Sequence, residues 1–378
     1  MADSVIEIQG KTLTLTNLDK VLYPATGFTK RQVIDYYARI APVLLPHLKG
    51  RALTLKRYPN GVDSEFFYEK NAPKHRPDWV KTVPVWSEGN NRTMYYVEAA
   101  DLPTLIWLAN LAAIELHPSL ALAKDVSCPT MMVFDLDPGP PANIVQCCQV
   151  AFWLREIFEH FNLQSFPKTS GSKGLQIYVP LNTRTSYDVT KPFARALAQL
   201  LEQEHPDAVV SDMKKSIRTG KVFVDWSQND QHKTTVAVYS LRARERPTVS
   251  TPVKWEEVER AFKKKHAGLL LFEAPQVVAR AEKMGDLFEP VLKLKQKLPD
   301  VKGLLAGVGE AAAKASEPER IDLAAQAEAR PTPAARVQPK KAATKRTGNK
   351  AANKFEQNPV ARDGKKPSLT AAKSRRRV

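Results

Sequence analysis

Two aspartates that end an apolar run are the residues of this sequence best suited to bind a cation. Asp135 and Asp137 follow the apolar residues 131–134 and precede Pro138 and Gly139. Alternate side chains of a β-strand project from one face, so both carboxylates would point the same way and could share a divalent cation. Two solvated acids at the end of a strand have the same spacing, so the pair alone does not decide between these interpretations.

A third aspartate, Asp225, ends a second apolar run, residues 221–225. If this run forms a strand beside the first, three carboxylates converge, and their repulsion favours a bound cation. Carboxylate oxygens suit Mg²⁺ or Mn²⁺, and two such ions roughly 3.5–4 Å apart can activate a 3′-hydroxyl and support a leaving pyrophosphate. That chemistry is typical of polymerases, although nucleases and nucleotide-sugar transferases use the same ligands.

The segment KTSGSKG, residues 168–174, is the best candidate for binding phosphate. It offers a hydroxyl at Ser170, an ammonium at Lys173, and two glycines that can expose backbone N–H groups. Its spacing differs from that of a Walker A motif, and an ordinary polar loop is the alternative. Arg242 and His117 could also face phosphate, although a lone histidine more often caps a helix or packs in a core.

Lysines and aromatic residues in the N-terminal part suit contact with nucleic acid. Lys20 and Lys30 flank a turn with proline and glycine, and Phe66 and Phe67 follow a basic pair in LKRYPNGVDSEFFYEK. A nucleobase stacked on an aromatic ring contributes about 1–3 kcal/mol whatever the base. Adjacent phenylalanines belong to a core more often, and the residues alone favour that interpretation.

The elements that would position these residues are helices interspersed with short strands. Thr29 and Gln32 form the pattern of a capping box ahead of apolar residues at helical spacing. Further helices are predicted over residues 103–116, 141–161 and 190–205, and strands over 130–137, 175–181 and 221–227. The strands do not alternate regularly with helices, which predicts an α+β fold with mixed or antiparallel sheets rather than a doubly wound one.

The chain is basic, and the excess of positive charge is concentrated at one end. It has 57 Lys and Arg against 40 Asp and Glu and a pI of about 9.6, which favours a polyanionic partner. Residues 301–378 hold 18 of the basic residues and 7 of the acidic ones. We therefore expect a catalytic domain over 1–300 and a basic, largely disordered tail over 301–378 that adds sequence-neutral affinity for DNA.

The sequence lacks the usual features of secreted and membrane proteins. Its three cysteines form no CxxC pair, and we interpret them as reduced thiols in the core. No apolar run approaches the roughly 20 residues of a membrane helix, and the first residues lack the pattern of a signal peptide. We expect a cytoplasmic protein with no membrane partner.

Taken together, the motifs resemble one protein family, the polymerase domain of bacterial ligase D in the archaeo-eukaryotic primase superfamily. The resemblance covers roughly residues 10–295. Its motifs, which occur in the order found in that family, are TNLDKVLYPATGFTK, GRALTLKRYPNGVDSEFFYEK, AAIELHPS, VFDLDPG, KTSGSKGLQIYVPL, GKVFVDWSQN and YSLRARERPTVSTPV. The resemblance implies a primase-polymerase-like body of mixed or antiparallel sheets flanked by helices.

The resemblance also implies an activity and a set of site residues. Members of this family hold a double-strand break by its downstream 5′-phosphate and add nucleotides, preferably ribonucleotides, with two manganese or magnesium ions. The metal ligands fall on Asp135, Asp137 and Asp225. The positions that contact the incoming nucleotide fall on Lys56, His117, Ser170, Lys173, Gln176, Gln228 and Arg242. The residues of the 5′-phosphate pocket fall on Lys20 and Lys30. The aromatic pair beside the template base falls on Phe66 and Phe67.

Two departures from the family pattern bear on function. Gln176 stands where many relatives have histidine, and its amide can hydrogen-bond phosphate but cannot become cationic. Ala361 occupies the position of the nucleophilic lysine in the ligase motif KxDG. No nuclease domain is evident either, so sealing and trimming would need partners. The resemblance implies Ku and a separate ATP-dependent DNA ligase, with 5′-phosphorylated DNA and ribo- or deoxyribonucleoside triphosphates as substrates.

We therefore expect a primer-extending nucleotidyltransferase that fills gaps during bacterial non-homologous end joining and associates with the nucleoid. Two other classes fit parts of the sequence. A phosphohydrolase with Asp135 as its nucleophile would release phosphate without DNA. A non-catalytic end-binding module with structural acids would bind 5′-phosphorylated DNA without extending a primer.

Overall fold

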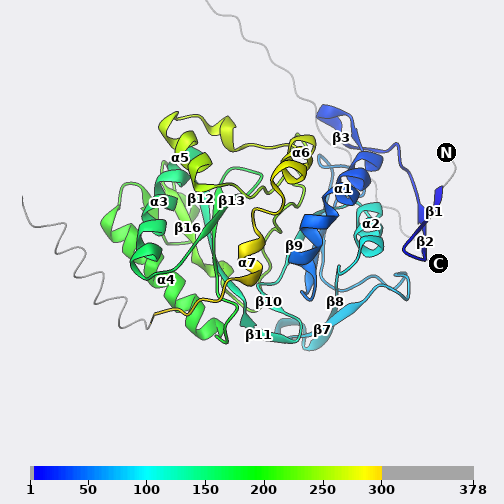
Figure 1. Cartoon of the computed structure of the whole chain (residues 1–378), viewed down its shortest axis with the longest axis horizontal. Helices are drawn as coiled ribbons and strands as arrows, with labels where there is room; N and C mark the ends of the chain where they lie inside the picture. Colours follow the sequence, from blue (N-terminus) through cyan, green and yellow to red (C-terminus); the bar gives the residue numbers. More distant parts are fainter. Residues whose placement is uncertain (1–3, 300–378) are drawn as a thin grey trace, which may run out of the picture. The chain divides into compact units, whose positions relative to one another are not determined.

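The computed structural model describes residues 4–299, in which strands and helices are interspersed (Figure 1). The strands are β1 Ser4–Ile8, β2 Lys11–Leu15, β3 Val21–Tyr23, β4 Phe28–Thr29, β5 Leu53–Arg57, β6 Phe67–Glu69, β7 Thr82–Ser87, β8 Arg92–Val97, β9 Ala113–Pro118, β10 Ala121–Leu122, β11 Asp125–Pro129, β12 Met131–Pro138, β13 Phe166–Thr169, β14 Leu175–Pro180, β15 Val209–Val210 and β16 Val222–Asp225. The helices are α1 Lys30–Leu48, α2 Leu102–Asn110, α3 Ile144–His160, α4 Tyr187–Glu204, α5 Trp255–Lys263, α6 Ala274–Met284 and α7 Glu289–Lys293. The tail expected over residues 301–378 lies outside the described residues.

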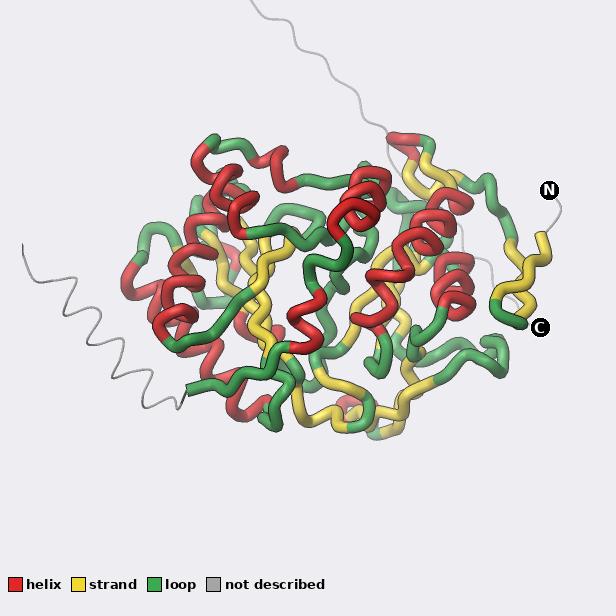
Figure 2. Tube along the Cα trace, viewed as in Figure 1, coloured by secondary structure: helices red, strands yellow, loops and turns green. Residues whose placement is uncertain are grey.

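A five-stranded mixed sheet holds the two strands that end in aspartates. Its order is β13-β14-β12-β16-β15, and only β15 and β16 pair in parallel. The strands predicted over 130–137, 175–181 and 221–227 are confirmed as β12, β14 and β16. The predicted mixed α+β architecture is confirmed as well, and Figure 2 shows the helices beside the strands.

The central strand β12 separates two hydrophobic cores. Its even-numbered residues, 132–136, pack with residues of α3 and α4. Its odd-numbered residues Met131 and Val133 join the other core, which is built from α1, α2, β5 and β9. The alternation of the strand then places Asp135 and Asp137 on this second face, at the end of the strand, where the apolar contacts stop.

A second sheet has the order β6-β5-β8-β7, and β9 pairs with β5. In the β5–β9 pair, Lys56 lies opposite Glu115 and Thr54 lies opposite His117. Directly opposite side chains share a face of the sheet, so this pairing gathers all four polar groups on one side.

The predicted helices are confirmed with one exception. Thr29 caps α1 with the expected capping box, because its N–H donates to Gln32 Oε1 at 2.8 Å and its Oγ1 accepts from Gln32 N at 3.4 Å. The helices predicted over 141–161 and 190–205 are α3 and α4. The helix predicted over 103–116 is wrong beyond Asn110, the last residue of α2.

The error over residues 111–116 arises because a continuous apolar run fits a buried helix and a buried strand equally well. Ala112 takes a left-handed conformation with φ of 54°, and the following residues form β9, which pairs along β5. Pairing with a distant strand therefore decides the local structure here.

Two further expectations concern thiols and membranes. Cys147 and Cys148 are buried free thiols, as expected, whereas Cys128 is only partly buried. No helix between residues 4 and 299 has the length and apolar character that a membrane crossing requires.

Candidate active site

The strand register places the three aspartates on one face of the mixed sheet. β12 pairs antiparallel with β16 so that Asp135 lies directly opposite Asp225. Residues paired in this way have Cβ atoms about 4.5–5.5 Å apart on the same face. Asp137 lies two residues further along β12 and therefore on that face too. Acids separated by 88 or more positions in the chain thus become neighbours.

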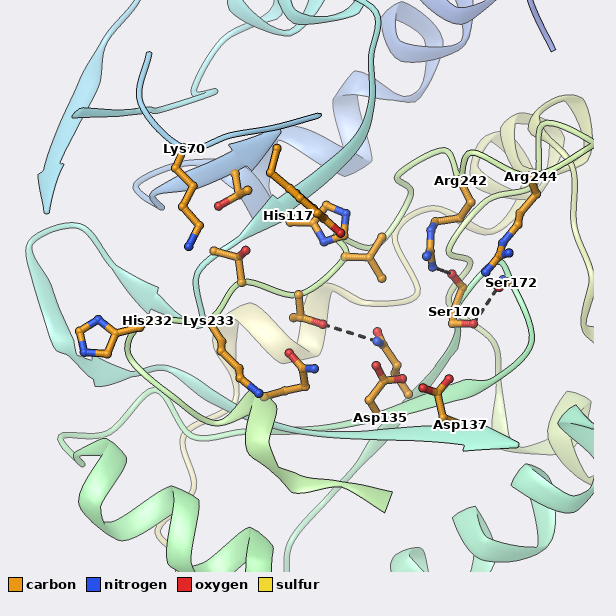
Figure 3. A pocket seen from close by; sticks show the side chains of 17 residues that line it. Lys70, His117, Asp135, Asp137, Ser170, Ser172, His232, Lys233, Arg242 and Arg244 are labelled. Carbon is orange, nitrogen blue, oxygen red and sulfur yellow. Dashed lines mark hydrogen bonds between the residues drawn. The ribbon is translucent and has the colours of Figure 1, made fainter. Parts of the chain in front are cut away.

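A pocket of about 590 Å³ opens at Asp135 and Asp137 (Figure 3). Five of the residues expected to contact a nucleotide line this pocket, namely His117, Ser170, Gln176, Gln228 and Arg242. Figure 3 shows Arg242 and Arg244 on one side of the two aspartates and Lys70 on the other. The sequence pattern gave Arg244 no special role, yet it lines the pocket as well.

Burial and the charges of neighbouring aspartates shift the pKa values of Asp135 and Asp137. Burial, followed by the charges of Asp137 and Asp225, raises the pKa of Asp135 to about 7. Removal from solvent and the charge of Asp225 also raise the pKa of Asp137, although its side chain lies at the exposed rim of the pocket. A divalent cation would relieve this repulsion, and carboxylate oxygens are its preferred ligands. The acids therefore fit a site for Mg²⁺ or Mn²⁺.

The carboxylate of Asp225 is engaged in local hydrogen bonds. Its Oδ1 accepts from Ser227 N at 2.9 Å and from Ser227 Oγ at 2.5 Å, and its Oδ2 accepts from Gln228 Nε2 at 2.8 Å. These bonds cap the short 3-10 turn over residues 226–228. Among residues 4–299, no three His, Cys, Asp or Glu side chains are arranged to hold a metal ion as they stand. To complete a three-carboxylate site, Asp225 would have to turn from this cap toward Asp135.

The loop between β13 and β14 is shaped by close packing against β12. A Cβ atom on Gly174 would lie 2.0 Å from the carbonyl oxygen of Leu136, so only glycine fits there. Ser170 Oγ accepts from Gly174 N at 3.1 Å and from Ser172 N at 3.2 Å. The Gly174 N–H, which was expected to face phosphate, therefore bonds to Ser170 instead.

Two of the expected nucleotide contacts lie outside the lining of this pocket. Lys173 lines a neighbouring apolar depression of about 360 Å³ at the start of α3, and Ser172 is common to both cavities. Lys56 Nζ lies 4.0 Å from the centre of the Phe66 ring. Burial lowers the pKa of Lys56, against the opposing charge of Glu115.

Glu115 is a buried carboxylate beside His117 and Arg242, and it was not among the predicted site residues. Its Oε2 lies 3.0 Å from His117 Nε2, and its Oε1 accepts from Ala243 N at 3.0 Å and lies 3.4 Å from Arg242 Nε. Burial alone would raise the pKa of Glu115, but His117, Arg242 and Lys56 outweigh it and hold this pKa well below its usual range. The sequence does place Glu115 two residues before His117. That spacing puts both side chains on one face only if the segment is a strand.

Glu115 also fixes the state of the His117 ring. A carboxylate only accepts hydrogen bonds, so Nε2 carries the hydrogen that lies between the two groups. Burial lowers the pKa of His117, although Glu115 acts in the opposite direction. The ring is thus neutral near pH 7 and can take a second proton when an anion enters the pocket. Beside it, Arg242 Nη1 donates to the carbonyl oxygen of Ser170.

Lys20 and Lys30 lie close together, and neither is among the residues that line the pocket of the aspartates. The backbone N–H of Lys30 donates to the carbonyl oxygen of Lys20 at 2.8 Å. Lys20 Nζ is at the surface and donates to Asn60 Oδ1 at 2.8 Å. Lys30 is buried, and its Nζ donates to the carbonyl oxygen of Thr16 at 2.7 Å. Of the two ammonium groups, that of Lys20 is the more accessible to a ligand.

Phe66 and Phe67 are exposed, with 48% and 43% of their surfaces accessible. The core interpretation, which the residues alone favoured, is therefore wrong for both. Lys56 lies over the Phe66 ring, and the Arg57 guanidinium lies 5.0 Å from the centre of the Phe67 ring. An exposed aromatic surface flanked by cations suits a stacked, negatively charged nucleic acid strand.

The fold and the site together define a class of protein: an α+β domain with acidic and basic side chains in one pocket. A family model described as the primase-polymerase domain of LigD matches residues 29–288. The multifunctional non-homologous end joining protein LigD of Mycolicibacterium smegmatis is 43% identical over 279 residues, which are 73% of this chain and 36% of that protein. The bifunctional non-homologous end joining protein LigD of Bacillus subtilis is 32% identical over 274 residues, 72% of this chain and 43% of that protein.

A solved structure is similar over most of the described residues. The polymerase domain from Mycobacterium tuberculosis ligase D, in complex with DNA, matches with a TM-score of 0.69 and 40% identity. The match covers 75% of this chain and 99% of that one. The chain belongs to the LigD primase-polymerase domain family. It spans less than half the length of the curated relatives that it matches.

Proposed function

We propose that this chain is a template-dependent nucleotidyltransferase that extends a primer across gaps at double-strand breaks during bacterial non-homologous end joining. The observation that carries the proposal is the register that sets Asp135 opposite Asp225, beside a pocket that Asp135 and Asp137 line together with His117 and Arg242. The relatives named for end joining support the biological setting. The related domain solved with DNA supports the substrate.

The proposed roles of the pocket residues follow from charge and position. A nucleoside triphosphate would place its negative charges against Arg242, Arg244 and His117, which gains a proton as the anion enters. The three aspartates would hold two Mn²⁺ or Mg²⁺ ions, which would supply activation of the primer 3′-hydroxyl and support for the leaving pyrophosphate. Asp135 and Asp137 line the pocket as they stand, and Asp225 joins them by leaving its cap on residues 226–228.

The remaining substrate contacts concern the DNA strands. Lys20 and Lys30 would bind the downstream 5′-phosphate, and the exposed rings of Phe66 and Phe67 would stack beside the template base. We include in the proposal the preference for ribonucleotides. Because Ala361 replaces the nucleophilic lysine of KxDG, sealing falls to a separate ATP-dependent ligase, with Ku as a further partner at the break.

Extension of a gapped duplex tests this function. Wild-type protein, Mn²⁺ and ribonucleoside triphosphates should extend the primer on a duplex with a downstream 5′-phosphate. Asp137→Ala should abolish extension while the affinity for the duplex stays within about twofold, because the acid acts on the reaction and not on docking. Wild-type protein that binds the duplex but never extends it would refute the proposal.

One observation favours a second candidate, a non-catalytic module that binds 5′-phosphorylated ends. The Asp225 carboxylate is already satisfied by Ser227 and Gln228, as expected of a structural acid. This candidate predicts binding that depends on the 5′-phosphate and no extension under any metal condition. The same assay therefore separates the two candidates.

A further inference from the structure

A row of polar side chains crosses the mixed sheet beside the aspartates. Lys168 on β13 lies directly opposite Gln176 on β14, and Gln176 lies opposite Asp135 on β12. Asp135 in turn lies opposite Asp225 on β16. Since directly paired residues share a face, the four side chains form one continuous row on the face of the pocket. Lys168, at the end of this row, has no part in the function proposed above.

Lys168 is a fully buried lysine, with 0% of its surface accessible. Its Nζ donates to Gln176 Oε1 at 2.5 Å and to Ser250 Oγ at 2.6 Å, and it lies 5.4 Å from the centre of the Tyr178 ring. Burial of an ammonium group is costly unless its hydrogen bonds are made. A shorter apolar side chain would fill this core at lower cost, so the position calls for an explanation in terms of what the ammonium does.

The ammonium determines which way the Gln176 amide points. A lysine ammonium only donates, so the amide atom beside it is the oxygen, and the NH₂ group is turned to the other side. There Gln176 Nε2 lies 3.5 Å from Thr235 Oγ1. Gln176 also lies opposite Asp135 in the strand register, and its side chain lowers the pKa of that carboxyl group, as an N–H group turned toward an ionised carboxylate does. Without a donor at Lys168, the two ends of the amide could exchange and turn an oxygen toward the carboxylate.

We infer that Lys168 is a positioning residue that acts through Gln176 to hold the Asp135 carboxylate in place for a divalent cation. The inference rests on the proposed role of Asp135 as a metal ligand. Groups that orient a metal ligand from behind change metal affinity about 10–100-fold when they are removed. This role of Lys168 also explains how glutamine can function at position 176, because an amide needs an orienting donor to present its N–H groups to a carboxylate.

Binding of Mn²⁺ to the full chain, without nucleotide or DNA, tests this inference. The electron paramagnetic resonance signal of free Mn²⁺ gives the affinity directly. Lys168→Met keeps the length of the side chain and removes the donor, and Gln176→Met removes the amide. Each should weaken Mn²⁺ binding about tenfold or more. The double variant should bind no more weakly than either single variant, because both changes break the same link.

Ser250→Ala is the matched control. It removes the other hydrogen-bond partner of Lys168 and leaves the contact with Gln176 intact. If Lys168 served only to stabilise this part of the core, Ser250→Ala and Lys168→Met would lower the thermal unfolding temperature and leave Mn²⁺ affinity unchanged. We expect Ser250→Ala to keep its Mn²⁺ affinity within about twofold of the wild type.

The outcomes distinguish this inference from the proposed function. Should Lys168→Met fail to fold in a thermal unfolding control, Gln176→Met alone carries the test. Unchanged Mn²⁺ affinity in the folded variants, or losses that add in the double variant, would overturn the role of Lys168 and leave the proposed function standing. Wild-type protein that binds Mn²⁺ no better than Asp135→Asn would instead refute the metal site, and this inference with it.

Discussion

Lowering the pH from about 8 to about 6 should weaken Mn²⁺ binding at the aspartates about tenfold, because a cation binds only the ionised carboxylate. The pKa of Asp135 is raised to about 7 by burial and by the charges of Asp137 and Asp225. For such a group, roughly nine tenths of the carboxylates are ionised at pH 8 and roughly one tenth at pH 6. A carboxyl group with the ordinary pKa of 3.8 would stay ionised over this range, and the affinity would barely change.

In the absence of cation, lowering the pH should increase the stability of the fold, although it weakens Mn²⁺ binding. A carboxyl group whose pKa is raised in the folded state binds its proton more tightly there than in the unfolded chain. In the absence of cation, Asp135 therefore contributes stability that is fully present below its ordinary pKa of 3.8 and is lost as the pH rises through about 7. Mn²⁺ should consequently raise the thermal unfolding temperature more at pH 8 than at pH 6.

The assay is a Mn²⁺ titration at several pH values, read by calorimetry or by the signal of free Mn²⁺. Asp225→Asn should move the midpoint of the pH dependence to lower pH, because the charge of Asp225 helps to raise the pKa of Asp135. Asp125→Asn, a change at an exposed acid on β11, is the control and should leave the midpoint where it is. Mn²⁺ affinity that does not vary between pH 6 and pH 8 would refute this reasoning.

Three further changes give predictions elsewhere in the chain. Glu115→Ala should lower the free energy of unfolding in urea by about 1–3 kcal/mol at pH 7, because the partly buried Arg242 and Lys56 lose their carboxylate partner. Since the pKa of Glu115 is depressed in the fold, this loss should shrink as the pH falls below its ordinary 4.5, and a loss independent of pH would contradict the ion pairing. Gly174→Ala should cost about 1–3 kcal/mol and slow nucleotide addition, because its Cβ would press on the Leu136 carbonyl. Gly89→Ala, where a Cβ meets open space, is its control, and equal effects of the two changes would argue against the packing role. Deletion of residues 301–378 should make the dependence of DNA affinity on salt less steep, and an unchanged slope would remove the role of the tail in DNA binding.

Local pattern was enough to predict the acidic half of the site. The alternation of residues 131–137 predicted two carboxylates on one face of a strand, and the second apolar run predicted a strand that ends at Asp225. The pairing of Asp135 with Asp225 could only be stated as a condition, because register depends on which strands become neighbours. The resemblance to a family, rather than periodicity, supplied the expected nucleotide contacts, of which five line the pocket.

The positioning residues were missed because their roles depend on distant partners. Glu115 fell inside a run that was predicted as helix, and only its pairing with β5 makes the segment a strand. Lys168 contacts Ser250, which lies 82 positions further along the chain. The cap at Asp225 had a local signal, since an aspartate two residues before Ser227 is typical of an Asx turn. Asp225 was expected to be a metal ligand, and this turn was not predicted.

The most direct test of the central claim is extension of a gapped, 5′-phosphorylated duplex by Asp225→Asn in Mn²⁺ with ribonucleoside triphosphates. Asparagine can still accept the hydrogen bond from Ser227 N, so the cap on residues 226–228 is kept while the charge is lost. Asp212→Asn, at an exposed acid whose carboxylate accepts from Lys214 N, is the matched control. We expect Asp225→Asn to bind the duplex normally and to extend it at least about 100-fold more slowly than the wild type. Extension at the wild-type rate would contradict the claim that Asp225 acts with Asp135 and Asp137 in one catalytic site.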